Sequence, residues 1–356
     1  MGKRYTLPIA LGWYGIAFSD ELKVGDVKAL HYFGREIVLF RTESGAAKVL
    51  DAYCPHLGAH LGVGGKVKGE SIACPFHGWQ LDGQGIVTAI PYAERIPPKI
   101  EGKPCNHSYP VVEMNKTIWA WYHPNNEPPS FEVVKIDELY DEAWVEDLIH
   151  HDWVVNAAVQ ETAENAADKA HFAFVHRAQT VPEAEIVHEG PRRNAHMISM
   201  TPHMDENGKM DETGTLWRES YLDTSNNGPG QTWQTFSGLF DTLMLALITP
   251  INDDHIHMRF AYTQKKDQNE LQKIMAQSLI DEISSQVEED IPIWENKIFR
   301  PDPNLCDGDG PIYQYRKWFS QFYVEPLDPE VVTKGNLGAP GKQELMNKIS
   351  VREIKS

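Results

Sequence analysis

Residues 51–80 read DAYCPHLGAHLGVGGKVKGESIACPFHGWQ, and this stretch decides how the first part of the chain is interpreted. It holds two of the four cysteines of the chain, and each of the two is followed within three residues by a histidine. The pattern is Cys54-X-His56, then 17 residues, then Cys74-X-X-His77. A proline follows each cysteine and restricts the backbone there. Two such loops can close on one metal centre from opposite sides.

Two metal centres use two cysteines and two histidines. A structural zinc ion is the simpler one, but zinc fingers usually place the two cysteines together and the two histidines together. Here each loop carries one cysteine and one histidine. A Rieske 2Fe–2S cluster needs this mixture, because thiolates hold one iron and imidazoles hold the other. The spacing therefore favours a Rieske cluster, with a zinc staple as the alternative.

Strand patterns surround the two loops. Turn residues separate the members of two pairs of apolar runs, which predicts an all-β N-terminal unit built of hairpins. A chain of 356 residues with 41% apolar content exceeds the usual single core. The segment HPNNEPPSFE that starts at His123 is typical of a linker, so we expect domains at 1–130 and 131–356. The runs are REIVLFR at 35–41, AKVLDAY at 47–53, YPVVEM at 109–114 and TIWAWYH at 117–123.

The second unit mixes helices with strands. Helical patterns cover 156–176 and 267–299, and strand patterns with turns between them fill the region between the two helices. We expect an α+β fold in which helices pack on an antiparallel sheet, of the helix-grip type. The predicted strands are HMISMTPHM, TLWRESYLD, QTWQTFSGLF, LMLALITPI and HIHMRFAYT.

A second group of polar side chains lies in NAADKAHFAFVH, which contains Asn165, Asp168, His171 and His176. Histidines five residues apart point ~140° away from each other on an ideal helix. They converge only if the helix widens or ends between them. Taken alone, such a pair is more often part of a core or a surface than of a metal site.

The helix predicted at 267–299 carries three consecutive acidic residues at 288–290. Its apolar stripe places Asp290 on the buried face, whereas Glu288 and Glu289 are predicted to point away from it. A carboxylate among core residues is costly unless a cation offsets its charge. The stripe consists of Ile283, Val287, Ile291 and Trp294.

The motifs CPHLGAHL, CPFHGWQLDGQG and Asn-X2-Asp-X2-His-X4-His together resemble the Rieske non-haem iron oxygenases. The resemblance covers roughly residues 10 to 325. It implies that Cys54, His56, Cys74 and His77 hold a 2Fe–2S cluster. A separate electron-transfer protein would share this domain but would not need the second group of side chains.

The resemblance also implies a mononuclear Fe(II) held by His171, His176 and Asp290, with positions left open for O2. Asp168 and Asn165 are implied as further catalytic residues. In the resembled family an aspartate at the position of Asp168 links a ligand histidine to a cluster histidine of the neighbouring subunit. For this chain the link would join His171 to a neighbour's His77, which implies a head-to-tail homotrimer.

Three longer stretches, at 54–70, 89–99 and 307–325, are similar to a subgroup that contains bacterial 3-ketosteroid 9α-hydroxylase oxygenase components and cholesterol 7-desaturases. This similarity implies a monooxygenase that acts on a steroid or sterol. Sterol 4-methyl oxidation with demethylation and sterol 7-desaturation are the alternative reactions. Large apolar side chains either line a substrate cavity or fill the core: Trp217, Trp233, Phe236, Phe240 and Met244.

Composition limits the partners. The formal net charge of −18 disfavours binding to nucleic acid, and the longest apolar run is too short to span a membrane. Four cysteines in a chain of this length do not make a disulfide scaffold, and the N-terminus is a poor secretory signal, so we expect a cytoplasmic protein. The chain has no Gly-X-Gly-X-X-Gly motif, so the electrons should come from a separate NAD(P)H-dependent flavin and iron–sulfur reductase. A zinc-stapled lipid-binding module is the alternative of another class.

Overall fold

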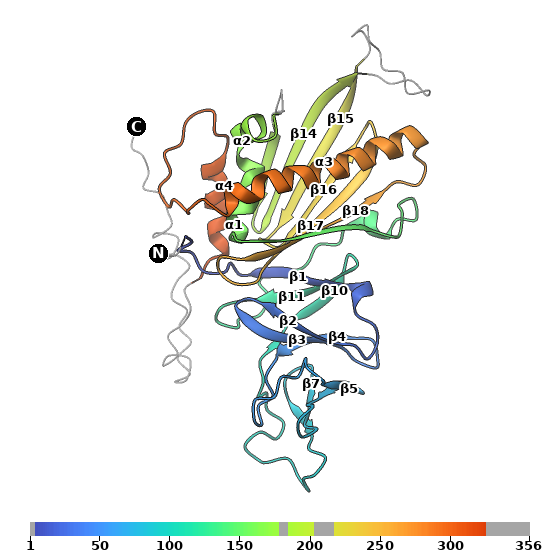
Figure 1. The fold of residues 1–356 in the computed structure, drawn as a ribbon, viewed down its shortest axis with the longest axis vertical. Coiled ribbons are helices and arrows are strands. Elements are labelled where there is room, and N and C mark those ends of the chain that lie inside the picture. Colours follow the sequence, from blue (N-terminus) through green and yellow to red (C-terminus); the bar gives the residue numbers. More distant parts are fainter. Residues whose placement is uncertain (1–3, 178–183, 203–216, 325–356) are drawn as a thin grey trace.

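The computed structural model describes residues 4–177, 184–202 and 217–324. Two β-rich parts are stacked along the long axis of the molecule (Figure 1). The N-terminal strands form the lower part, and the upper part is a large sheet crossed by one long helix. The residues between the first two predicted strands of the second unit, at 205–214, lie outside the described residues.

The N-terminal part contains three small antiparallel sheets, with the strand orders β1-β11-β10, β2-β3-β4-β9 and β5-β6-β7-β8. This confirms the all-β prediction. The strands that the sequence did not reveal are mostly two or three residues long, too short to show an alternating pattern. The bounds are β1 Gly12–Phe18, β2 Val27–Tyr32, β3 Arg35–Arg41, β4 Ala47–Asp51, β5 Lys66–Lys68, β6 Ser71–Ala73, β7 Gln80–Asp82, β8 Val87–Ala89, β9 Ser108–Tyr109, β10 Val111–Met114 and β11 Thr117–Tyr122.

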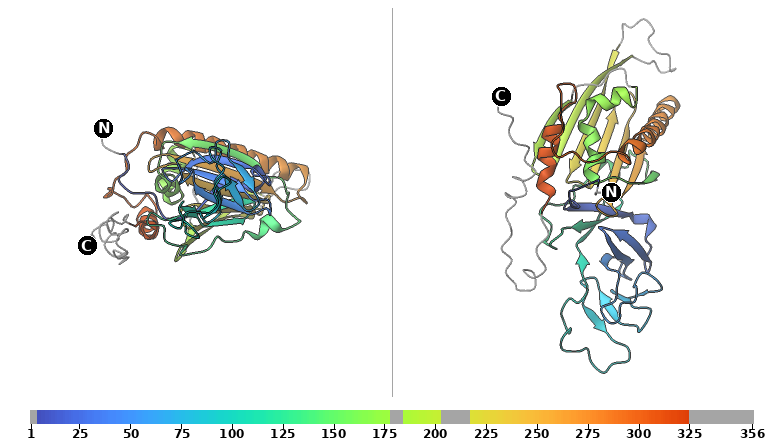
Figure 2. Two further views of the ribbon diagram at one scale, coloured as in Figure 1. Left: turned by 90° about the horizontal axis from the view of Figure 1, so that it is seen from below. Right: turned by 60° about the vertical axis from the view of Figure 1, so that its left-hand side comes forward.

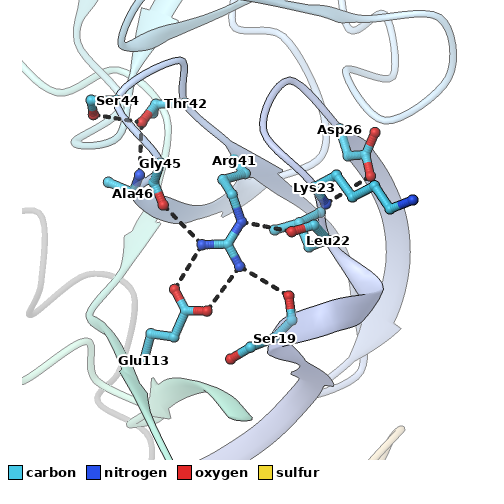
Figure 3. Close-up of polar contacts among 10 residues, drawn as sticks. All are labelled: Ser19, Leu22, Lys23, Asp26, Arg41, Thr42, Ser44, Gly45, Ala46 and Glu113. Atoms are coloured by element: carbon cyan, nitrogen blue, oxygen red, sulfur yellow. Dashed lines mark hydrogen bonds and ion pairs between the residues drawn. The ribbon is translucent and has the colours of Figure 1, made fainter. Parts of the chain in front are cut away.

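A buried arginine at the end of β3 connects two of these sheets (Figure 3). The two outer nitrogens of Arg41 bond the two carboxylate oxygens of Glu113 on β10 at 2.7 and 2.8 Å. The remaining donors reach the main-chain oxygens of Leu22, Gly45 and Ser19. Because all five N–H donors of the guanidinium have an acceptor, and Glu113 supplies a negative charge, the charge of Arg41 is compensated although the side chain is buried.

The C-terminal part is built on one antiparallel sheet of seven strands in the order β12-β18-β17-β16-β15-β14-β13. All five predicted strands are present as β14 to β18. Two further strands, at the two edges of the sheet, have too few buried residues to be recognised in the sequence. The bounds are β12 Ile149–Val155, β13 Ala184–Glu189, β14 Arg192–Pro202, β15 Trp217–Asn227, β16 Gln231–Ser237, β17 Thr242–Pro250 and β18 Ile256–Gln264.

Helices cover this sheet, as Figure 2 shows from two further directions. The helix predicted at 267–299 is α3, Glu270–Trp294, which begins with a capping box between Asn269 and Gln272. The helix predicted at 156–176 is broken into pieces. The remaining bounds are η1 Ser19–Glu21, η2 Asp137–Tyr140, α1 Val159–Ala163, η3 Glu164–Ala167, α2 Lys169–Phe174, α4 Ile312–Phe319 and η4 Ser320–Phe322. The α+β class with helices on an antiparallel sheet is thus confirmed.

One large hydrophobic core is shared by the two parts. Trp13 and Trp119 of the N-terminal strands belong to the same buried cluster as Leu247 and Tyr262 of the large sheet. Thr249 on β17 also donates a buried hydrogen bond to the main-chain oxygen of Gly15 on β1 at 2.6 Å. A second, smaller core lies beneath the two Cys/His loops. The division near residue 130 stays a prediction.

No helix in the described part of the chain is both long and apolar enough to cross a lipid bilayer.

Candidate metal centres

Two loops of the N-terminal part bring the predicted cluster residues together. The loop between β4 and β5 carries Cys54 and His56, and the loop between β6 and β7 carries Cys74 and His77. The two imidazole rings lie with their centroids 4.7 Å apart. Both cysteines are buried, at 3% and 5% exposure. The four side chains therefore converge on one place from opposite sides.

The two loops share one backbone conformation. The N–H of Gly58 donates to the main-chain oxygen of Cys54 at 2.9 Å, and the N–H of Gly78 donates to that of Cys74 at 3.0 Å. Both glycines have positive φ angles, +74° and +72°, which residues with a Cβ rarely adopt. Each cysteine is thus held by a tight turn that closes four residues later.

The donor atoms in the loops fit a bound metal cluster. The Nδ1 atoms of His56 and His77 are buried and have no hydrogen-bond partner among the described residues. Such orphaned groups are rare because they lose their hydration without compensation. Burial raises the pKa of the Cys54 thiol to about 11, and the neighbouring Cys74 adds to this rise. Ligation by a metal would satisfy the imidazoles and stabilise the thiolates at the same time.

A single zinc ion fits less well. In the part of the chain that the structure describes, the only three or more metal-ligating side chains close enough to share one ion are His171, His176 and Asp290. The four loop residues do not form such a set, although a tetrahedral zinc site would need one. A cluster with two irons spreads its ligands over a longer span.

Aromatic side chains cover the loops. The ring of His56 stacks on Trp79 with centroids 4.5 Å apart and planes 5° apart. The indole N–H of Trp79 donates to the hydroxyl of Tyr92 at 2.8 Å. These contacts hold the imidazole in place.

The second candidate centre lies in the C-terminal part. The ligand atoms of His171, His176 and Asp290 all lie within 4.8 Å of one another. The two histidines converge because α2 ends at Phe174 and His176 follows the helix end. Of the two routes that the sequence allowed, a helix that ends between the histidines is the one observed.

Asp290 is buried at 7% exposure, as the helix stripe predicted. One carboxylate oxygen lies 3.4 Å from Nε2 of His176 and accepts a hydrogen bond from the amide of Asn165 at 2.8 Å. The amide oxygen of Asn165 accepts from the indole N–H of Trp294 at 3.2 Å. Burial raises the pKa of Asp290, and the two histidines oppose that rise. Asn165 therefore orients a candidate ligand, which is a positioning role.

Glu289 was assigned wrongly from the sequence. Its carboxylate does not point away from the site but lies 3.0 Å from Nδ1 of His176. The helical stripe could not reveal this contact, because the stripe describes where Cα and Cβ point. A glutamate beside the stripe has enough length to bend back toward it. Glu288, by contrast, is exposed as expected.

Asp168 occupies the junction between η3 and α2. Its carboxylate accepts a hydrogen bond from the main-chain N–H of His171 at 3.1 Å and so caps α2. The ring Nδ1 of His171 lies 2.7 Å from the main-chain oxygen of Asp168 and 3.9 Å from its carboxylate. Within one chain, the imidazole is therefore oriented by the backbone of Asp168, and the side chain is 33% exposed.

A cavity of about 300 Å³ adjoins the second centre. Of the apolar residues expected to line it, Phe236 and Met244 do so. Trp233 and Phe240 are not among its lining residues, and the side chain of Trp217 lies outside the described residues. Trp233 alternates with Thr232 and Gln234, which face the cavity, so the pleat turns it to the other side of the sheet.

Comparisons with known proteins agree with this arrangement. Residues 12–102 match the Rieske [2Fe-2S] domain, and residues 120–323 match the 3-Ketosteroid 9alpha-hydroxylase C-terminal domain. A 3-ketosteroid-9-alpha-monooxygenase oxygenase component of Rhodococcus rhodochrous is 30% identical over 90% of this chain and 84% of its own length. Cholesterol 7-desaturase nvd 1 of Ciona intestinalis is 31% identical over 88% of this chain and 68% of its own length.

Solved structures show the same fold. Dicamba monooxygenase matches with a TM-score of 0.60 and 19% identity, over 87% of this chain and 96% of the other. Pseudomonas putida CBB5 NdmB matches with a TM-score of 0.66 and 16% identity, over 86% and 89%.

The fold and the two centres define a Rieske-type non-haem iron oxygenase, with one 2Fe–2S cluster and one mononuclear iron. Within that class, the chain belongs to the family of the 3-ketosteroid 9α-hydroxylase oxygenase components and the related cholesterol 7-desaturases. It is accordingly an oxidoreductase of the monooxygenase type.

Proposed function

We propose that this protein is the terminal oxygenase component of a multicomponent monooxygenase that inserts one oxygen atom from O2 into a steroid or sterol. The observation that carries the proposal is the cavity beside His171, His176 and Asp290 in a chain of this family. Its volume of about 300 Å³ lies at the lower end of the range of roughly 300–1,000 Å³ for small-molecule sites. A rigid apolar ring system suits such a space.

The chain's own residues would divide the work between the two centres. Cys54, Cys74, His56 and His77 would hold the cluster, and His171, His176 and Asp290 would hold the mononuclear iron. When bound, these groups supply electron transfer and the activation of O2. Asn165 would keep the Asp290 carboxylate oriented through its hydrogen bond at 2.8 Å.

The apolar walls of the cavity would exclude water and place the substrate next to the iron ligands. Most of the side chains that line it are apolar. They include Met197, Leu222, Phe236, Met244, Ile248, Met258, Phe260, Ile283 and Val287.

The electrons would come from a separate NAD(P)H-dependent reductase with flavin and iron–sulfur groups. The absence of a dinucleotide motif in the sequence supports this assignment. The cytoplasmic location also stays a prediction.

We infer a head-to-tail homotrimer from the resemblance to the Rieske oxygenases, and the placement of the two centres supports a contact of this kind between chains. The strands around the cluster loops, β5 and β7, lie at the opposite end of the molecule from α2 (Figure 1). In such an assembly, Asp168 would lie between His171 of its own chain and the residue His77 of the neighbouring chain that would hold the cluster. Exposed apolar side chains beside both centres support a contact between chains: Leu57 at 66%, Phe76 at 63%, Tyr92 at 62% and Phe174 at 88% exposure.

A substrate panel tests the proposal. The iron-loaded protein would be combined with a surrogate reductase, NADH and O2, and the products of 3-ketosteroids, sterols and non-steroid aromatic compounds would be analysed by mass spectrometry. We expect oxidation of a compound with a steroid nucleus. Turnover of the non-steroid compounds alone would contradict the substrate assignment.

The same experiment separates the alternative reactions. Hydroxylation adds one oxygen atom, desaturation removes two hydrogens, and attack at a 4-methyl group gives an alcohol and then more oxidised products. Iron analysis distinguishes the classes: an oxygenase holds about three irons per chain, an electron-transfer protein about two and a zinc module none.

A further inference from the structure

The cavity has a polar end that an apolar ring system does not require. Across the sheet, Arg193 of β14 pairs with Asn226 of β15, and Asn226 pairs with Thr232 of β16. All three side chains line the cavity. The same row continues into the apolar residues Ala246 and Phe260. These five residues are cross-strand neighbours, and along them the side chains change from polar to apolar.

Arg193 is almost fully buried, at 1% exposure, and has no carboxylate partner among the described residues. Its guanidinium donates to the side-chain oxygen of Asn226 at 3.3 Å and to the main-chain oxygen of Ala166 at 3.5 Å, both long. It also lies 5.7 Å from the ring of Tyr315. Among the residues that the structure describes, most of the five N–H donors of the guanidinium thus have no acceptor.

The other buried arginines of the described chain are compensated. Arg41 has the two-pronged pair with Glu113 shown in Figure 3, and Arg259 has a similar pair with Glu21 at 2.5 and 3.0 Å. A buried charge without a counter-charge costs several kcal/mol. Arg193 is therefore unusual within its own fold, and it lines the substrate cavity.

We propose that Arg193, with Asn226 and Thr232, binds a carboxylate group carried by the substrate. A carboxylate matches the planar fork of the guanidinium and supplies the missing negative charge, whereas a neutral ketone or hydroxyl supplies only an acceptor. The chain has a net charge of −18, so selection of an anion must come from a local group of this kind. The inference rests on the proposed function, because it specifies the substrate of the same cavity.

The test compares a steroid carboxylic acid with its methyl ester, which has the same ring system and no charge. Dissociation constants would be measured by isothermal titration calorimetry on the iron-loaded protein, without turnover. We expect the acid to bind at least about 10-fold more tightly than the ester, since hydrogen bonds to charged groups are the stronger ones. Equal binding of acid and ester, or tighter binding of the ester, would overturn the proposal.

Two neighbouring arginines provide matched variants. Arg193→Met should weaken binding of the acid by about 10- to 100-fold and leave the ester unchanged, while Arg193→Lys should restore part of the affinity. Arg192→Met is the control, because Arg192 is exposed and alternates to the other side of the strand. Equal loss of acid and ester in Arg193→Met would show that Arg193 only shapes the cavity. If that variant does not fold, the comparison in the wild-type protein and Arg193→Lys decide.

A polycyclic aromatic carboxylate separates this inference from the proposed function. If it binds through Arg193 while both steroids fail, the carboxylate site stands and the steroid assignment falls. If only the neutral steroid binds, the steroid assignment stands and the carboxylate site falls.

Discussion

Asp290 illustrates how a single ionisable side chain indicates a metal. It is buried at 7% exposure and faces two histidines, and its carboxylate needs a positive partner that the surrounding apolar residues do not provide. Its neighbour Asn165 can donate a hydrogen bond but cannot neutralise a charge. Iron would meet that need.

We therefore predict that Asp290→Ala loses the mononuclear iron and keeps the 2Fe–2S cluster, because the cluster loops belong to another part of the fold. Iron analysis and the visible spectrum of the cluster measure the two outcomes separately. Glu288→Ala, at an exposed position of the same helix, is the control and should keep both. Retention of all iron in Asp290→Ala would remove this residue from the ligand set.

Glu289 carries a second prediction. Its carboxylate lies 3.0 Å from the ring nitrogen of His176 that does not face Asp290, a contact that orients a candidate ligand histidine. Glu289→Ala should weaken iron binding by about 10- to 100-fold, whereas Glu289→Gln should retain part of the affinity because it preserves a hydrogen-bonding group. Titration of the iron-free site with Fe(II) gives the affinity. An unchanged dissociation constant would mean that this contact is a surface ion pair.

The junction of η3 and α2 connects the local backbone to the second centre. Asp168 ends one element and caps the next, so its φ of −89° and ψ of 104° break the helix that the sequence pattern predicted as continuous. The short α2 then presents His171 from its first turn and releases His176 just after its end. A continuous helix would point these rings apart.

Substitutions at Asp168 can separate its capping role from its proposed role between subunits. Asparagine is as good an N-cap as aspartate, so Asp168→Asn should keep stability and iron content. Asp168→Ala should lose about 0.5–2 kcal/mol of stability. If Asp168 also links two subunits, both variants should slow reoxidation of the reduced cluster with substrate and O2 in a single turnover. If the cluster of Asp168→Asn is reoxidised at the wild-type rate, Asp168 acts only as an N-cap and does not link subunits.

The whole molecule places its two centres far apart along its long axis, although one hydrophobic core joins the two parts (Figure 1). Such a core makes independent movement of the parts costly, since the buried apolar surface would be exposed to water. The cluster loops lie on the second, smaller core, which packs on the other face of β3: Ile37 and Leu39 belong to the large core, and Val38 and Phe40 belong to the small one. Bending that would bring the cluster of a chain to its own iron is therefore disfavoured. This rigidity supports transfer between chains.

Assembly is tested with Phe174→Ser, which changes a side chain on α2 that is 88% exposed. Removal of an aromatic anchor from an interface should weaken association by about 10-fold or more. Ile274→Ser is the control: Ile274 is 62% exposed and lies near the start of α3, whereas Asp290 lies near its end. Sedimentation velocity reports the oligomer, and iron analysis verifies that both centres remain. A wild-type protein that sediments as a monomer would contradict the trimer.

Local patterns in the sequence were sufficient for the cluster loops, the α+β class and the buried position of Asp290. Cys54, His56, Cys74 and His77 lie in two short loops whose spacing reflects their chemistry, and the long strands and α3 repeat their apolar residues with regular periods. These features depend on neighbours along the chain. They are therefore visible in one dimension.

Contacts between distant segments decided the rest. Glu289 reaches His176 across 113 residues of chain, and Asn165 reaches Asp290 across 125. Arg193 meets Asn226 only because β14 and β15 pair in one particular register. Packing of the core decides which side chains meet, where α2 ends and in which register the strands pair. It selects one arrangement among many that the local sequence pattern allows. That is why the sequence indicated the metals, while the orientation of their ligands and the polar end of the cavity followed only from the tertiary structure.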